Sequence, residues 1–390
     1  MKILAMPQQQ HYQGDDGWAK IADYLDAISA DNVLLVTGNS MYRASGAEQA
    51  LEPILREREV THLTCLHTNP EDEDVRQLLN GIGNKESYQA IIAVGGGSVI
   101  DTAKLLKAFW INPPSLDEHR GSEDNSELSP AALPLIAVPS TAGSGSEATR
   151  FAVVYKNKKK YSVEHDELLP NFSVVIPTLL ASVPQHVAAS SGMDALCQGI
   201  ESYWSIHSTN ESRKLAAEAI TLAWDWIEKA VNDRSSEALN HMAKASHLAG
   251  RAINITKTTA PHAISYPMTS YFGITHGHAV GLLTARFLTF NEGVTKEDCL
   301  DARGPEWVKK RLHEVCVLFG EDTVDDTAQG LTQKIKRIGL EIDLKQLGII
   351  TEEDIKTIVA NGLNPERVKN NPRVVTTNSA RDVLSIVHCP

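Results

Sequence analysis

Hydrophobic residues in the first half of the chain come in short runs that alternate with longer amphipathic stretches. Runs such as Val33–Val36 and Ile91–Val94 are typical of strands buried on both faces of a parallel sheet. Because strands that alternate with helices build such a sheet, this half is predicted to be an α/β domain. The predicted strands are 33–36, 62–66, 91–94, 135–138 and 172–176, and the predicted helices are 44–58 and 99–110.

In the second half the pattern changes to long helical repeats, and strand signals almost vanish. We place the boundary near Val183-Pro184. This predicts an α/β domain over residues 1–184 and an all-α domain over residues 185–390. The helices predicted most clearly are 193–207, 213–232, 237–255 and 260–270.

Two polar segments interrupt the first half. The stretch Asp117–Ser129 is expected to be a solvated loop. The basic run Lys156–Lys160 contains Asn157, a residue type that tolerates turn conformations, so a hairpin tip is predicted there.

Bulk composition narrows the function classes. The 390 residues carry a formal net charge of −12, which argues against a nucleic-acid partner. No apolar run approaches the roughly 18–20 residues of a membrane helix, and the first residues do not resemble a secretory signal. The five cysteines are scattered without a CxxC pair, which is typical of reduced thiols. We therefore expect a soluble, cytoplasmic protein without a membrane partner.

A glycine-rich loop follows the strand at 91–94. Gly95, Gly96, Gly97 and Ser98 lead into a helix whose first turn contains Asp101. Glycines allow close approach of a ligand, and the start of a helix favours an anion, so the loop is a candidate phosphate site. It follows the third strand and lacks the GxGxxG pattern, so it is not a standard Rossmann entry.

A second loop, Pro139–Glu147, follows the strand at 135–138 and is dense in small hydroxyl residues. Ser140, Thr141 and Ser144 can donate to a phosphate, a ribose or a nicotinamide amide. Loops at the carboxyl ends of parallel strands converge on the usual ligand crevice. Lys160 completes this set of candidate cofactor-binding residues, although each loop is also compatible with a plain turn.

Several histidines cluster with a carboxylate in the helical half. Asp194 and Gln198 are four residues apart and share a helix face, while His262 and His276 flank a segment that contains Tyr266. One carboxylate with two imidazoles suits a divalent first-row metal. Hydrogen-bonded structural residues are the alternative interpretation.

The motifs GGGSVIDTAK, VPSTAGSGSEAT, GMDAL and ITHGHAV occur in this order. Together they resemble the iron-containing (group III) alcohol dehydrogenases from about residue 30 to the C-terminus. The resemblance implies a dinucleotide-binding domain at 1–184, a metal- and substrate-binding helical domain at 185–390 and a homodimer. It also implies an NAD(P)-dependent alcohol dehydrogenase or aldehyde reductase.

By position, Asp194, His262 and His276 match three metal ligands of that family, with Fe²⁺ the expected ion and Zn²⁺ or Ni²⁺ as substitutes. Gln198 stands where the family carries a fourth, histidine ligand, and its neutral amide oxygen is a weaker donor. Tyr266 replaces another histidine that many relatives have near the substrate.

The segments DALCQGIESYWS and INITKTTAPHAISYPMTSYFG are similar to a phosphonoacetaldehyde reductase branch, in which glutamine at the position of Gln198 is usual. This likeness implies reduction of phosphonoacetaldehyde to 2-hydroxyethylphosphonate. A phosphonate dianion needs cations and donors. Lys257, Arg251, His278 and His165 are the candidate cations, and Thr258 offers a hydroxyl. A surface position is the alternative for Lys257.

The implied reaction is hydride transfer from a reduced nicotinamide to the aldehyde carbon, with the metal as Lewis acid. Tyr266, His278 or a ribose hydroxyl with water are candidates to deliver the proton.

The end of the strand at 33–36 bears on the choice of cofactor. Gly38 stands where NAD-preferring relatives often carry an aspartate, and Asn39 and Ser40 can donate to a phosphate. NADPH is therefore predicted over NADH.

Two other functions stay open. One is a general short-chain alcohol dehydrogenase. The other is a non-catalytic ligand-binding homologue whose metal site has decayed. The GMDAL and THGH motifs argue against the related dehydroquinate synthases and glycerol-phosphate dehydrogenases.

Overall fold

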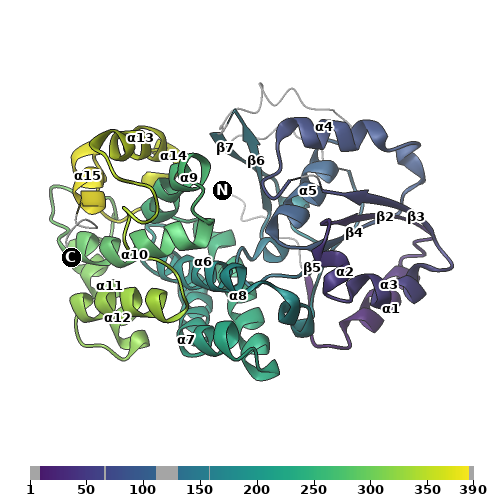
Figure 1. Cartoon of the computed structure of the whole chain (residues 1–390), viewed down its shortest axis with the longest axis horizontal. Helices are drawn as coiled ribbons and strands as arrows, with labels where there is room; N and C mark the ends of the chain where they lie inside the picture. The colour runs from purple at the N-terminus through teal and green to yellow at the C-terminus, as the bar shows by residue number, and fades with distance from the viewer. Residues whose placement is uncertain (1–8, 66, 111–130, 158, 386–390) are drawn as a thin grey trace. The chain divides into compact units, whose positions relative to one another are not determined.

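The computed structural model describes residues 9–65, 67–110, 131–157 and 159–385. The chain forms two compact units that divide between Val183 and Pro184 (Figure 1). Among the described residues, no helix has both the length and the hydropathy to cross a membrane.

A six-stranded sheet with the order β1-β8-β5-β4-β2-β3 forms the centre of the N-terminal unit, and all neighbouring strands run parallel. Parallel strands need a crossover between them, which the helices supply. The strands of this sheet are β1 (Gln10–Gln13), β2 (Asn32–Thr37), β3 (Glu59–Thr64), β4 (Ala90–Gly95), β5 (Leu135–Pro139) and β8 (Phe172–Val175).

Both faces of the sheet are buried, because successive residues of a strand point to opposite sides. Leu34 and Val36 of β2 belong to the same core as Val75 of α4. Val33 belongs to the opposite core, with Leu51 of α3. Figure 1 shows α4 and α5 on one side of these strands and α1, α2 and α3 on the other. The helices are α1 (Gly17–Ala27), α2 (Met41–Ala44), α3 (Ala47–Leu55), α4 (Asp72–Gly81) and α5 (Gly97–Ala108), with 3-10 turns at Lys85–Ser87, Ser146–Ala148, Asp166–Leu168 and Pro177–Ser182.

The predicted hairpin is confirmed. Strands β6 (Phe151–Lys156) and β7 (Lys159–Glu164) pair antiparallel, and Asn157 has a left-handed φ of 51° at the tip.

The C-terminal unit is helical in its described residues. The long helices α6, α7 and α8 pack side by side, and α10 crosses α6 and α9. Its helices are α6 (Gln185–Trp204), α7 (Asn210–Asn232), α8 (Ser236–Thr256), α9 (Ala260–Phe272), α10 (His276–Glu292), α11 (Pro305–Phe319), α12 (Val324–Arg337), α13 (Glu352–Gly362), α14 (Pro365–Val368) and α15 (Thr377–Ser385).

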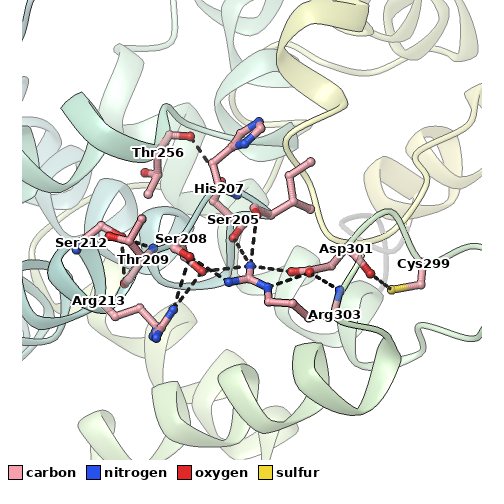
Figure 2. Close-up of polar contacts among 11 residues, drawn as sticks. Ser205, His207, Ser208, Thr209, Ser212, Arg213, Thr256, Cys299, Asp301 and Arg303 are labelled. Carbon is pink, nitrogen blue, oxygen red and sulfur yellow. Dashed lines mark hydrogen bonds and ion pairs between the residues drawn. The ribbon is translucent and has the colours of Figure 1, made fainter. Parts of the chain in front are cut away.

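Arg303 ties together the ends of two of these helices (Figure 2). Its guanidinium donates to the backbone carbonyls of Ser205 (3.3 Å) and Ser208 (2.8 Å) and pairs with Asp301 (2.7 Å). The Ser205 hydroxyl in turn donates to the carbonyl of Thr256, the last residue of α8. The carbonyl of Ser205, the residue that caps the C-terminus of α6, thereby gains a partner outside the helix.

The class of each domain is as predicted, and the differences lie in the bounds of some elements and in elements that were missed. The predicted helix 44–58 is two helices, because Gly46 has a φ of 79° between α2 and α3. The strand expected at 62–66 begins earlier, at Glu59, and α6 begins eight residues before the expected 193. The elements β1, α1 and α4 were not predicted. The loop expected at Asp117–Ser129 lies outside the described residues.

Candidate metal centre

The three candidate metal ligands come from three helices of the C-terminal unit. Asp194 lies in the middle of α6, and His262 lies in the first turn of α9 after Pro261, a residue type favoured at a helix start. His276 is the first residue of α10. Gly273, at a φ of 71°, ends α9 and reverses the chain between the two histidines.

These three side chains converge. One ligand atom from each lies within 4.8 Å of the others. Oδ1 of Asp194 is 3.2 Å from Nε2 of His262 and 3.9 Å from Nε2 of His276. Atoms bound to one ion at about 2.0–2.2 Å lie roughly 3–4 Å from each other, so the spacing fits a shared divalent cation. A carboxylate with two imidazoles is also a donor set that such an ion accepts.

Two of the three ligands are buried and the third is accessible. The side chains of His262 and Asp194 are 4% and 8% exposed, whereas that of His276 is 31% exposed. Ser265 lies 3.4 Å from Nδ1 of His276 and donates to the carbonyl of His262. The cluster is thus buried on the side of α6 and partly exposed on the side of His276.

Close helix packing holds the cluster together. A Cβ atom on Gly277 would lie 1.9 Å from the carbonyl oxygen of Ser190 and 2.8 Å from Cβ of Asp194. Only glycine permits α10 to approach α6 this closely, which brings the neighbouring His276 next to Asp194.

Glu201 is a buried carboxylate next to the cluster that the sequence interpretation did not single out. It is fully buried on α6, and its carboxylate bonds Nδ1 of His262 while accepting from the backbone and hydroxyl of Thr259 (2.7 and 2.8 Å). Its position seven residues after Asp194 was the available signal, since i and i+7 share a helix face.

The electrostatics of His262 follow from these neighbours. Burial by itself lowers the pKa of His262, but the carboxylates of Glu201 and Asp194 outweigh it and raise the pKa to about 10. The metal-free imidazole is therefore protonated at neutral pH, and a cation that binds there must displace a proton.

The two candidate proton donors have different surroundings. The Tyr266 ring stacks on His276, with centroids 5.6 Å apart. Nε2 of His278 lies 2.6 Å from the backbone carbonyl of Glu341, and burial lowers the pKa of His278. Tyr266 is thus next to the ligand cluster, while the ring of His278 is held by the chain itself.

The candidate substrate residues also differ. Lys257 has a φ of 58° and a ψ of 176° immediately after α8, a backbone region that is essentially restricted to glycine. Thr258 is buried, and its carbonyl accepts from the Asn370 amide (3.0 Å). Arg251 is exposed on α8.

In the N-terminal unit, the two glycine-containing loops touch. The backbone N–H of Ser140 donates to the carbonyl of Gly95 (2.9 Å). A Cβ on Gly97 would lie 2.4 Å from Oγ of Ser144, and one on Gly96 would lie 3.4 Å from Oγ1 of Thr141. Gly97 is therefore required for this contact. Ser98, in the first turn of α5, donates to the carbonyl of Thr68.

Asp101 contacts the protein itself. It accepts from the Ser146 hydroxyl (2.5 Å) and the backbone N–H of Val153 (3.1 Å). Burial raises the pKa of Asp101, and Lys104 is the strongest group opposing that shift; Lys160, on β7, opposes it more weakly.

Lys104 is a second buried charged residue that the sequence interpretation did not single out. Its buried amine contacts five oxygens at 2.6–3.1 Å, at the end of the second loop and just after it: the carbonyls and hydroxyls of Ser146 and Thr149 and the carbonyl of Phe151.

The strand end near Gly38 has room for a side chain. A Cβ on Gly38 would lie 3.6 Å from the nearest atom, on Val99, which is an ordinary contact. Ser40 precedes α2, and the nearby Arg43 pairs with Glu48 at 3.1 Å. Asn39 lies between Gly38 and Ser40, just after β2.

Two family models match the chain in succession. The model described as iron-containing alcohol dehydrogenase spans residues 8–177. The model described as the C-terminal domain of the Fe-containing alcohol dehydrogenase family spans residues 188–388.

The chain is also similar to individual proteins of this kind. The phosphonoacetaldehyde reductase of Streptomyces viridochromogenes is 34% identical over 301 residues, which cover 75% of this chain and 74% of that protein. The NAD-dependent methanol dehydrogenase of Bacillus methanolicus is 26% identical over 94% of each chain. The crystal structure of sulfoacetaldehyde reductase from Bifidobacterium kashiwanohense with NAD⁺ has a TM-score of 0.87 and 29% identity, covering 99% of this chain and 98% of that one.

Proposed function

Because the chain belongs to the iron-containing alcohol dehydrogenase family and is an NAD(P)-dependent alcohol dehydrogenase or aldehyde reductase, we propose that it reduces a small aldehyde with an anionic tail. Phosphonoacetaldehyde is the leading substrate and 2-hydroxyethylphosphonate its product. Two relatives are named for aldehydes of this kind, one carrying a phosphonate and one a sulfonate.

The backbone of Lys257 is the observation that carries the proposal. A non-glycine residue in this conformation costs about 1–3 kcal/mol and persists where the surroundings over-determine it. Here the surroundings are the end of α8 and the Thr259 contacts with Glu201, which also bonds His262. A strained backbone is thus maintained at a residue with a cationic side chain, on the segment that leads directly into a candidate metal ligand.

Asp194, His262 and His276 fit a divalent cation, and we assign them as its ligands, with Gln198 one helical turn from Asp194 as a weaker fourth. When bound, such an ion polarises a carbonyl oxygen as a Lewis acid. The chain's own part is to keep Nε2 of His262 and Oδ1 of Asp194 in place. We infer Fe²⁺ as the native ion, with Zn²⁺ or Ni²⁺ as substitutes.

Tyr266 is the better placed of the two proton-donor candidates. Its ring stacks on His276, the accessible ligand, whereas Nε2 of His278 is directed at the carbonyl of Glu341. We therefore assign Tyr266 to hold the proton that the product alcohol receives, and His278 to orient α10.

The touching loops of the N-terminal unit are assigned to the dinucleotide, whose reduced nicotinamide supplies the hydride. Helix α5 starts at Gly97, so the N–H groups of its first turn favour a phosphate. The absence of a carboxylate at Gly38, Asn39 and Ser40 favours NADPH over NADH.

Replacement of Lys257 by alanine tests the substrate assignment. A lost charge-assisted hydrogen bond costs about 1.5–3 kcal/mol, so kcat/KM for phosphonoacetaldehyde should fall roughly 10- to 100-fold. The value for neutral propanal should stay within about twofold. Lys244→Ala, on the exposed face of the same α8, is the matched control and should change neither value.

An equal effect of Lys257→Ala on both aldehydes would contradict the anionic-tail assignment and favour a general short-chain aldehyde reductase. A wild-type protein that turns over neither aldehyde, with either cofactor and added metal, would favour the non-catalytic homologue.

A further inference from the structure

Glu201 connects a candidate metal ligand with the segment that carries Lys257. One carboxylate oxygen bonds Nδ1 of His262, and the other accepts both the backbone N–H and the hydroxyl of Thr259. The residue is fully buried. A buried carboxylate is costly to desolvate and is retained where several donors satisfy it.

We propose that Glu201 is a positioning residue that fixes the tautomer and orientation of His262, so that Nε2 is presented to the metal. The inference rests on the metal site of the proposed function. The same carboxylate also fixes the Lys257–Thr259 segment relative to that ligand.

The direction of each hydrogen bond supports this role. A metal-bound imidazole carries its proton on the other nitrogen, and a carboxylate that accepts that proton fixes the ring. The Glu201 carboxylate can only accept, so Nδ1 of His262 carries the proton of that bond, while Nε2 faces Asp194 and loses its own proton when a metal binds. Trp204 completes the arrangement, because its indole N–H donates to the Thr259 hydroxyl (3.0 Å) and leaves that hydroxyl's proton for Glu201.

A neighbouring residue of α6, Ser202, binds the end of α8 just before this segment. The hydroxyl of Thr256 donates to that of Ser202 (2.9 Å). Glu201 thus both supports the segment and bonds the imidazole, whereas Ser202 contacts only the end of α8, so mutations of these two residues can separate the two roles.

Glu201→Gln is the informative change, because it keeps the shape and removes one acceptor. The backbone N–H of Thr259 can only donate, so the amide oxygen must face Thr259. The amide NH₂ then faces Nδ1 of His262 and forces the imidazole proton onto Nε2. That tautomer blocks the nitrogen that the metal requires.

The test is Zn²⁺ affinity of the metal-stripped full chain, measured by chelator competition, with fold checked by circular dichroism. Glu201→Gln should raise Kd for Zn²⁺ about 10- to 100-fold, the usual range for a lost partner of a metal-ligating histidine. Ser202→Ala is the matched control and should leave Kd within about twofold. The ¹⁵N spectrum of the zinc-loaded wild type should show a protonated Nδ1 on His262.

Equal Kd values for Glu201→Gln and wild type, or a zinc-loaded His262 without a proton on Nδ1, would overturn the positioning role. Equal losses in Glu201→Gln and Ser202→Ala would reduce Glu201 to mechanical support and overturn it as well. The His262→Ala variant distinguishes failure of the proposed metal site from failure of the positioning role of Glu201. If it binds Zn²⁺ as tightly as wild type, the metal site of the proposed function fails, and the inference fails with it.

Discussion

Two buried polar clusters, one in each unit of the chain, differ in how their charges are satisfied. In the N-terminal unit, the amine of Lys104 meets five protein oxygens and the carboxylate of Asp101 meets two protein donors. In the C-terminal unit, Oδ1 of Asp194 lies beside Nε2 of His262 and Nε2 of His276, and the His262 imidazole carries a proton when no metal is bound. A divalent cation that binds there would take the place of that proton, whereas the Lys104 network is complete within the protein.

The comparison teaches that a buried charge is not by itself evidence of a ligand site. Burial lowers the pKa of Lys104 to about 8, with Asp101 and then Glu147 opposing the shift, and yet its contacts are those of a structural lysine. The number and direction of the donors and acceptors distinguish the two cases.

The largest effect expected is on stability, from Lys104→Met. Removing one partner of a buried ionic network costs about 3–5 kcal/mol, because Asp101 would be left buried without its cation. Urea unfolding with and without Zn²⁺ measures this, and metal should not restore the loss. The double variant Asp101→Leu/Lys104→Met is the control and should lose less than the sum of the single changes. A single variant as stable as wild type would show that the network is not structural.

The next largest effect concerns His276→Ala. Loss of a ligand removes several kcal/mol of Lewis-acid stabilisation, so kcat should fall on the order of 10³-fold. Unfolding of the metal-free protein should be little changed, because the side chain is partly exposed. Turnover is measured with metal added to a stripped enzyme, and wild-type-like, chelator-resistant activity in this variant would contradict the assignment.

Of the two residues changed in these predictions, His276 was predicted from the sequence and Lys104 was not. The α/β and helical halves were predictable because the buried runs at Val33–Val36 and Ile91–Val94 and the long helical repeats are strong local signals. Strand β1 was not, because Gln10–Gln13 has no hydrophobic alternation and depends on backbone pairing with β8. Asp194, His262 and His276 were named from motif positions. The i+7 spacing from Asp194 places Glu201 on the same helix face, but the contacts of Glu201 and Lys104 span 42 to 61 residues of sequence, which no local pattern encodes.

A smaller effect is expected from Gln198→His. An imidazole is a stronger ligand than a neutral amide, so affinity for Zn²⁺ should rise about tenfold or more. Chelator competition measures the affinity for Zn²⁺. The control is Gln198→Leu, which shows whether the amide of Gln198 contributes to binding. If histidine weakens binding, position 198 does not face the ion.

The smallest effect is expected at the cofactor. Gly38→Asp introduces a carboxylate that repels a 2′-phosphate, so the ratio of kcat/KM for NADPH to that for NADH should fall roughly tenfold. Gly38→Ala is the control, because its added Cβ meets only an ordinary contact with Val99. A wild type that already prefers NADH by tenfold or more would show that this strand end does not select the cofactor.

The contacts of Arg303 have a consequence for how the chain folds during synthesis. The arginine bonds carbonyls 95 to 98 residues earlier in the sequence, so the end of α6 lacks these partners until that much more chain has been made. Contacts of such long sequence separation slow folding, since the intervening loop must close first. We expect nascent chains that end before Arg303 to expose the α6 terminus to protease. Limited proteolysis of stalled chains that end on either side of this residue would show the change.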